Sequence, residues 1–296
     1  MAITAKQLKR RKNHIGSSDM LAVLGGDIYK SAFDVFLEKT GQLTEQKENK
    51  QMFAGTMFES GVLDYAEQML GKLKRNQRRI APDGLPIASN TDAMVVSDGS
   101  PVDAKTSGLF GPLNKDWGEP GTDEIPNYVI VQAQTHILCC RSDVCYIPAF
   151  LAGRGFQMFI VHYNERLIQM IREEAVKFWE YVKAVQPPPD TQPTMRAISR
   201  MIREPDKIIN IPNEPVELWQ KTKEIKKIAV LAEKIAQKKV LALLGDAEVG
   251  QSEAGTVTYK EQSRKEYTVK STTFRVARLS NVKALPAALG LALGMD

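Results

Sequence analysis

SNTDAMVVSDGSPVDAKTS, residues 89–107, is the stretch that decides the fold of this chain. Two apolar runs flank an Asp-Gly pair, which predicts a β-hairpin because these residues tolerate the backbone angles of a tight turn. Asp92 lies in the first run, and Asp103 and Lys105 lie in the second. A strand that only covers a core would exclude these charges. The hairpin therefore predicts a functional corner of the molecule.

The charged residues of the hairpin suit a metal site. Side chains alternate across a strand, so Asp103 and Lys105 share a face, and Asp92 can approach the same end of the sheet. Carboxylate oxygens are the ligands of hard cations such as Mg²⁺. Glu59, on a helix expected over residues 53–70, is the natural additional carboxylate. A metal held there would activate water and offset charge on a phosphodiester, with Lys105 orienting or deprotonating that water.

The spacing of Asp92, Asp103 and Lys105 does not by itself decide between two interpretations. An Asp followed by Asp-x-Lys also suits a solvated hairpin edge whose charges prevent aggregation. Further motifs are needed to choose between the two.

Composition and charge set limits on the class of protein. The chain has 296 residues, of which 43% are hydrophobic and 25% charged, as expected for a globular protein with one large domain and an appendage. Apolar runs end well before the roughly 18 residues of a membrane span. The first residues lack the apolar centre of a signal peptide, so a cytoplasmic location is expected. A net charge of +5 permits nucleic acid as a partner without requiring it.

The cysteines and histidines predict no metal centre of their own. Cys139, Cys140 and Cys145 lie in one apolar segment, which favours buried free thiols. Three thiols in one chain cannot build a four-cysteine cluster. The three histidines show no metal-ligand spacing.

Periodicity and turn signals predict an α/β domain over residues 1–190, ended by the proline-rich stretch QPPPDTQP, and an extension over 191–296. The extension should hold a long amphipathic helix and a basic hairpin near 255–280. Residues 107–127 read as a loop with an exposed Trp117. Phe110 and Trp117 are candidates either for stacking on an unpaired base or for anchoring the loop. The other expected elements are strands over 87–96, 101–107, 143–153 and 156–164, and helices over 128–140 and 165–185.

Four motifs follow one another along the chain: RKNHIGSSD (11–19), GTMFE (55–59), NTDAMVVSDGSPVDAKTS (90–107) and YVIVQAQTHIL (128–138). In this order they resemble the PD-(D/E)xK nuclease core and, within it, the lambda exonuclease-like, YqaJ-type phage recombination nucleases. With a closing strand and helix over 156–191, the match covers roughly residues 8–191. Two departures are Asp103, where many members have glutamate, and the absence of a proline before Asp92.

The resemblance implies a central mixed β-sheet flanked by helices and a Mg²⁺-dependent exonuclease, with two ions and Mn²⁺ as a substitute. Such an enzyme degrades one strand of duplex DNA from its 5′ end and leaves a 3′ overhang for a single-strand annealing protein. A homo-oligomeric ring, a bacterial cytoplasmic setting and a phage origin also follow from the resemblance. It assigns metal binding to Glu59, Asp92, Asp103 and the Ala104 carbonyl, water handling to Lys105 and Gln132 (Gln134 as the alternative), and contacts to DNA or a 5′-phosphate to Arg11, Ser18 and Asn90.

Two other functions remain open from the sequence. The same core could serve a structure-specific or restriction-type endonuclease, or a non-catalytic DNA-binding scaffold. Against the scaffold, the three acidic residues and the lysine of the site are all present together. Ser17 or Ser18 is expected to cap a helix, and Asp19 is expected to be a structural partner of the basic start of the chain rather than a ligand.

Overall fold

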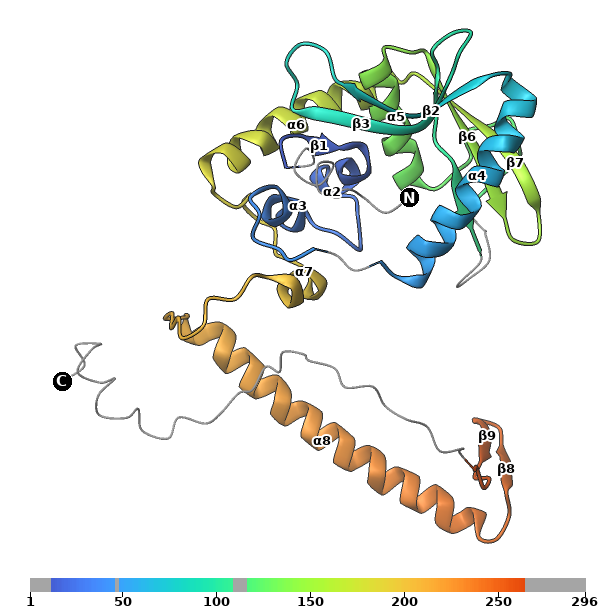
Figure 1. The fold of residues 1–296 in the computed structure, drawn as a ribbon. Helices are drawn as coiled ribbons and strands as arrows, with labels where there is room; N and C mark the ends of the chain where they lie inside the picture. Colours follow the sequence, from blue (N-terminus) through green and yellow to red (C-terminus); the bar gives the residue numbers. More distant parts are fainter. Residues whose placement is uncertain (1–11, 46–47, 109–115, 264–296) are drawn as a thin grey trace, which may run out of the picture. The chain divides into compact units, whose positions relative to one another are not determined.

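A computed structural model describes residues 12–45, 48–108 and 116–263, and its first part is built on a seven-stranded mixed sheet (Figure 1). Its strands are β1 (Ile15–Gly16), β2 (Leu73–Ile80), β3 (Ile87–Val95), β4 (Pro101–Val102), β5 (Lys105–Ser107), β6 (Val144–Leu151) and β7 (Gly155–His162). β3 pairs antiparallel with β2 and β4 and parallel with β1. β6 pairs parallel with β4 and β5 and antiparallel with β7.

Helices cover both faces of this sheet. The helical elements are η1 (Ser17–Asp19), α2 (Met20–Val23), α3 (Ala32–Lys39), α4 (Lys50–Leu70), α5 (Asn127–Cys140), α6 (Glu165–Ala184) and α7 (Met195–Arg200). On one face, Leu63 and Ala66 of α4 pack with Ala93 and Val102. On the other, α5, α6, α2 and α3 share a larger core with alternate residues of β6. The predicted α/β class, a mixed sheet flanked by helices, is confirmed.

The Asp-Gly turn forms as predicted, but the strand after it is divided. Gly99 has a φ of +77°, and its N–H donates to the Val95 carbonyl. The second strand was expected to run from 101 to 107, whereas β4 ends before Asp103 and β5 begins after Ala104. The Asp103 N–H still donates to the Tyr146 carbonyl at 3.0 Å. The interruption therefore changes the backbone conformation at Asp103 and Ala104, while the chain stays hydrogen-bonded to β6.

Strand β2 is absent from the sequence-based prediction. Its sequence, LKRNQRRI, has no apolar alternation, and Leu73 is its one buried residue. The strand exists because its backbone pairs with β3 over seven positions, from Leu73 opposite Val95 to Ile80 opposite Ala88. The basic cluster at residues 72–79 is thus part of an edge strand of the sheet.

Two local predictions were wrong. Gly16, not a serine, precedes η1, and no side chain caps it. Trp117 was expected to be exposed. It is only 5% exposed, and its ring centroid lies 5.1 Å from that of Phe159, because the loop folds onto the core. Phe110 lies outside the described residues.

The prediction of free, largely buried thiols is confirmed, since Cys139 and Cys145 are buried and Cys140 is partly so.

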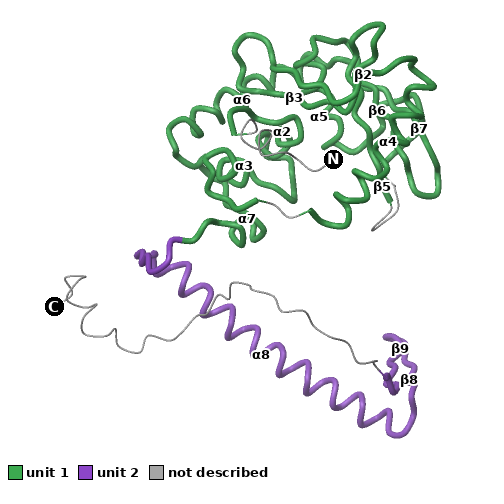
Figure 2. The backbone as a smooth tube through the Cα atoms, viewed as in Figure 1, with its two compact units in different colours: residues 1–203 green, residues 204–296 purple. Residues whose placement is uncertain are grey.

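The chain divides into two compact units, Met1–Arg203 and Glu204–Asp296 (Figure 2). The division falls later than the proline-rich stretch because α7 packs on the first unit. Ala197 is buried in the core, and the Thr194 N–H and hydroxyl donate to the Asp34 carboxylate at 2.8 and 2.7 Å. Asp34 itself completes the capping box of α3 with Ser31.

The second unit consists of α8 (Asn213–Leu244), β8 (Val249–Ser252) and β9 (Gly255–Thr258). The long helix agrees with its prediction, and its apolar positions Ile225, Ile228 and Leu231 are more than half exposed. The hairpin occupies 249–258 rather than 255–280, and residues from 264 onward lie outside the described part. Among the described helices, none is apolar over a length that could cross a membrane.

Asp19 is a structural residue, and its partners among the described residues are two lysines that follow it in the chain. Its two carboxylate oxygens lie 2.7 Å from Lys30 Nζ and 2.8 Å from Lys39 Nζ, and the Lys39 side chain is only 4% exposed. Burial alone would raise the pKa of Asp19, but the charges of Lys30 and Lys39 outweigh burial and hold this pKa far below its usual range. This network anchors η1 to α3.

Replacing Asp19 with Asn should therefore destabilise the first unit. The change breaks the ion pairs of Asp19 with Lys30 and with the buried Lys39, and breaking a buried ion pair typically costs about 3–5 kcal/mol. Because the folded-state pKa of Asp19 is lowered, its contribution is present above the unfolded pKa of about 3.9 and is lost as the pH falls. The difference between the wild type and Asp19→Asn in urea unfolding should be large at pH 7 and shrink below about pH 4.

Asp64→Asn is the matched control, because Asp64 pairs with Arg75 but is 60% exposed. An exposed pair contributes about 1 kcal/mol or less. Equal unfolding midpoints for the wild type and Asp19→Asn at pH 7 would contradict the anchoring role.

Candidate active site

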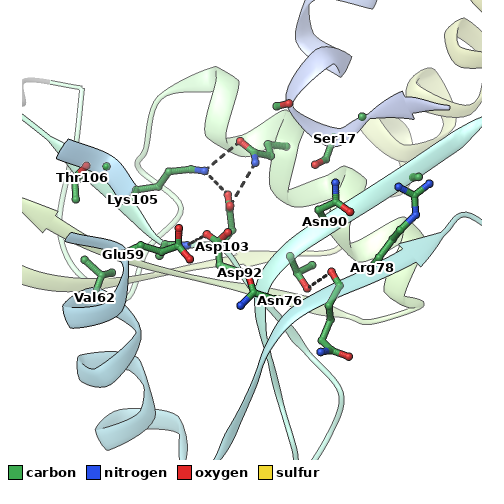
Figure 3. Close-up of a pocket in the computed structure, with 18 of the residues that line it drawn as sticks. Ser17, Glu59, Val62, Asn76, Arg78, Asn90, Asp92, Asp103, Lys105 and Thr106 are labelled. Atoms are coloured by element: carbon green, nitrogen blue, oxygen red, sulfur yellow. Dashed lines mark hydrogen bonds and ion pairs between the residues drawn. The ribbon is translucent and has the colours of Figure 1, made fainter. Parts of the chain in front are cut away.

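A cavity of about 570 Å³ opens between α4, η1 and the strands β2, β3 and β5 (Figure 3). The side chains of Glu59, Asp92, Asp103 and Lys105 gather at one end of it. At the other end lie Ser17, Arg78 and Asn90. The acidic residues and lysine predicted from the hairpin therefore share one cavity.

Asp103, Lys105 and Gln132 form a closed triangle. Lys105 Nζ lies 2.6 Å from Asp103 Oδ2 and donates to Gln132 Oε1 at 3.2 Å. Gln132 Nε2 in turn donates to Asp103 Oδ1 at 3.3 Å. α5 supplies the glutamine and the chain around β5 supplies the other two residues. Each side chain is therefore oriented by the other two.

Asp92 approaches this triangle from β3. Its Oδ2 accepts a 2.8 Å hydrogen bond from the Ala104 N–H, which the break between β4 and β5 leaves free of the sheet. Burial, and then the negative charge of Asp103, raise the pKa of Asp92 to about 7. Burial would also raise the pKa of Asp103, but the nearby Lys105 holds that pKa well below its usual range. The two carboxylates thus differ in their affinity for a proton.

Lys105 is a charged group in this arrangement. Burial alone would lower the pKa of its ammonium, but the charges of Asp103 and Asp92 outweigh burial and raise it. The role of base, one of the two functions considered for Lys105, needs a lowered pKa. The geometry instead favours Lys105 as a donor that orients oxygen atoms.

Glu59 projects from α4 into the same end of the cavity. Among the described residues, no three His, Cys, Asp or Glu side chains already stand together as a complete metal site. The donor chemistry nevertheless fits a hard cation. The carboxylates of Asp103 and Glu59 place negative charge near Asp92 and help to raise its pKa. A cation would relieve that repulsion.

The other residues assigned from the sequence fall in different places. Ser18 and Asn90 both line the cavity, and Figure 3 shows Asn90 at the end away from the carboxylates. Arg11 lies outside the described residues. Gln134, the alternative to Gln132, is buried elsewhere: it donates to the His162 carbonyl at 2.6 Å and accepts from the Asn164 N–H. Gln134 thus holds the connection between β7 and α6.

Sequence reasoning missed the cavity residues of β2. Arg78 pairs across the ladder with Asn90, which brings a guanidinium to the same end of the cavity as Asn90. Asn76 has a left-handed backbone, with φ of 54°, at the position of β2 opposite Asp92. Left-handed residues inside strands concentrate at functional sites. The polar sequence of β2 concealed both residues, because no apolar pattern marked it as a strand.

Comparison with known proteins finds one matching family. Residues 6–142 match the family described as the YqaJ-like viral recombinase domain. This part of the chain is therefore similar to that family. The matched region holds the cavity residues from Glu59 to Gln132 and ends soon after α5. The resemblance inferred from the four motifs is confirmed.

One curated relative is the uncharacterized protein YqaJ of Bacillus subtilis strain 168, which is 29% identical to the YqaJ-like chain over 177 residues. The alignment covers 58% of this chain, and the chain spans only 54% of that relative's length. Solved structures with some likeness include an alkaline exonuclease from Laribacter hongkongensis, which is 15% identical. The match covers 62% of this chain and 94% of the exonuclease, with a TM-score of 0.48. A phage-related exonuclease from Haemophilus somnus 129PT has 16% identity, 58% and 94% coverage and a TM-score of 0.46.

The raised pKa of Asp92 predicts how the stability of the metal-free protein depends on pH. Between the unfolded pKa of about 3.9 and the folded pKa of about 7, the folded state holds a proton that the unfolded chain releases. Stability therefore falls as the pH rises through this window. Asp92→Asn has no carboxyl to ionise, so its stability should not fall in this way. In EDTA, the urea midpoint of Asp92→Asn minus that of the wild type should increase from pH 5 to pH 8.

Asp123→Asn serves as the control, because Asp123 is exposed and its midpoint relative to the wild type should not vary with pH in this range. A constant difference between Asp92→Asn and the wild type from pH 5 to pH 8 would refute the shared burial of the two carboxylates.

Proposed function

We propose that this YqaJ-like chain is a Mg²⁺-dependent deoxyribonuclease that digests linear duplex DNA from the 5′ end and leaves 3′ overhangs. The observation that supports it most is the convergence of Asp92, Asp103, Lys105 and Gln132 in one cavity. These groups come from β3, from the chain around β5 and from α5. Phosphodiester hydrolysis needs a metal-binding set of oxygens beside a cation that orients the nucleophile, and this cavity supplies both.

The metal would be held by Asp92 and Asp103, with Glu59 as the third carboxylate and the Ala104 carbonyl as a further oxygen. When bound, it supplies an activated water and offsets charge on the phosphate. The sequence-based proposal of two ions, with Mn²⁺ able to replace Mg²⁺, is retained. The oxygen-only donor set supports the choice of these hard cations.

Lys105 and Gln132 have the geometry to orient the attacking water. A lysine ammonium has three hydrogens, and here one faces Asp103 and one is donated to Gln132. The third is left for a water or phosphate oxygen. Gln132 fixes the lysine by accepting from it and fixes Asp103 by donating to it. Such preorganised donors lower the barrier because they need no rearrangement during the reaction.

The opposite end of the cavity suits the terminal phosphate of the strand being digested. Ser18 and Asn90 provide neutral donors, and Arg78 adds a guanidinium whose fork matches phosphate oxygens. Arg11 remains part of this proposal as a residue that reaches the same phosphate. An anion bound at this end with the carboxylates at the other would place the first phosphodiester of a 5′ end beside the metal. This arrangement is compatible with the 5′ polarity, which the proposal takes from the family resemblance.

The proposal extends to partners. The 3′ overhang is a substrate for a single-strand annealing protein, and a homo-oligomeric ring would keep the enzyme on its DNA. Both follow from the family resemblance. The exposed apolar stripe of α8 is compatible with protein contacts of either kind.

Digestion of linear duplex DNA labelled separately at the 5′ and 3′ ends tests the function. The wild type with Mg²⁺ should release 5′ nucleotides, and EDTA should abolish the reaction. Lys105→Met should slow it by about 100- to 1,000-fold, the usual cost of losing an oriented charged donor. Lys177→Met is the matched control, because Lys177 lies on α6 with 62% exposure and should leave the rate unchanged.

The same assay separates the alternatives. Cutting of closed circular DNA would indicate an endonuclease on the same core. Release of 3′ label first would reverse the polarity. Intact linear DNA with Mg²⁺, accompanied by retained DNA binding, would replace the catalytic proposal with a non-catalytic scaffold.

A further inference from the structure

His136 is a fully buried polar side chain that the proposed function leaves without a role. It lies on α5 one helical turn after Gln132, so both side chains leave the helix on the same face. His136 has 0% exposure, and so has Ser89 on β3. Buried polar groups are normally held by hydrogen bonds, so the contacts of this histidine carry information.

The two ring nitrogens of His136 face different partners. Nδ1 makes a short hydrogen bond with the Ser89 hydroxyl. Nε2 faces Asp103 Oδ1 at 3.7 Å, slightly beyond hydrogen-bond length. Among the described residues, Nε2 has no hydrogen-bond partner. Asp103 is thus the acceptor toward which this nitrogen is aimed.

Electrostatics decides which nitrogen carries the proton. An unprotonated Nε2 would direct its lone pair at a carboxylate oxygen, and two acceptors repel each other. A proton on Nε2 turns this contact into an attraction. Ser89 can then donate its hydroxyl hydrogen to Nδ1, which keeps the proton on the other nitrogen. The pair therefore supports the Nε2–H form.

We propose that Ser89 and His136 together position the carboxylate of Asp103 for metal binding, with His136 Nε2–H as the donor to Oδ1. This inference rests on the proposed function, since it concerns a ligand of the proposed metal. Gln132 Nε2 already donates to the same oxygen at 3.3 Å. Two donors from one face of α5 thus hold Oδ1, and Lys105 faces Oδ2, which leaves one lone pair of Oδ2 for a cation. His136 is a positioning residue, because it acts through Asp103.

Donors behind a metal-binding group restrict its rotation and raise its affinity for the metal. Loss of such a partner typically weakens metal binding by about 10- to 100-fold. A purely structural role for His136, in which it only satisfies Ser89, would alter stability but not metal affinity. Metal binding and stability therefore distinguish the two roles.

The first measurement needs no substitution in the site. The ¹⁵N shifts of the imidazole in the metal-free full chain report which nitrogen carries the proton, and only three histidines have to be assigned. His14→Gln and His162→Gln identify the other two signals. A proton on Nε2 of His136 is expected. Its absence would overturn the proposal.

The second measurement is Mn²⁺ binding to the full chain by calorimetry, without DNA. His136→Met removes the donor and should weaken binding by about 10- to 100-fold. His136→Gln keeps an N–H donor at similar reach and should stay within about 3-fold of the wild type, a smaller loss than for a missing donor. His162→Met is the matched control, since His162 is exposed and should have no effect. Unfolding midpoints are recorded for all variants.

The outcomes separate this inference from the proposed function. If the wild type binds Mn²⁺ and Asp92→Asn does not, but His136→Met binds as the wild type does, the positioning role is refuted and the metal site stands. If the wild type binds no Mn²⁺, both proposals fail. If His136→Met does not fold, Ser89→Ala decides: weaker Mn²⁺ binding supports the inference, and unchanged binding refutes it.

Discussion

The hydrogen bond from the Ala104 N–H to the Asp92 carboxylate is the contact on which the site depends. It exists because the strand after the Asp-Gly turn is interrupted between β4 and β5, which frees one N–H from the ladder. Asp103 stays attached to β6 at this point through its own N–H. A continuous strand would have kept the Ala104 N–H in the ladder, and Asp92 would lack this donor.

The carboxylates of Asp92 and Asp103 lie close together at this contact, and their proximity shifts the pKa values of both groups. Burial and the charge of Asp103 raise the pKa of Asp92, whereas Lys105 lowers the pKa of Asp103. The pair is tolerable without metal only because one member can take up a proton and the other has an ammonium partner. The same arrangement makes Lys105 a charged donor rather than a base. Of the two roles expected from the sequence, orienting the water and deprotonating it, it favours the first.

Helix α5 connects the core to the chemistry. One side of it packs in the larger hydrophobic core through Val129, Ala133 and Ile137, all nearly inaccessible. Another face presents Gln132 to the triangle and His136 to the rear of Asp103. Because the helix is fixed by its apolar side, the polar side chains have little freedom. Rigid packing is the condition for preorganised catalysis.

The sequence by itself determined the hairpin, most of the large elements, the YqaJ-type resemblance and the group of Glu59, Asp92, Asp103 and Lys105, because turn chemistry, apolar periodicity and motif spacing are local properties. Tertiary structure alone decided the rest. β2 became a strand by pairing with β3, Trp117 became buried by packing on Phe159, and Asp19 came to pair with Lys30 and Lys39. The choice of Gln132 over Gln134, and the approach of His136 to Asp103, required the packing of α5 against the sheet. These contacts join residues far apart in sequence, and no local pattern encodes them.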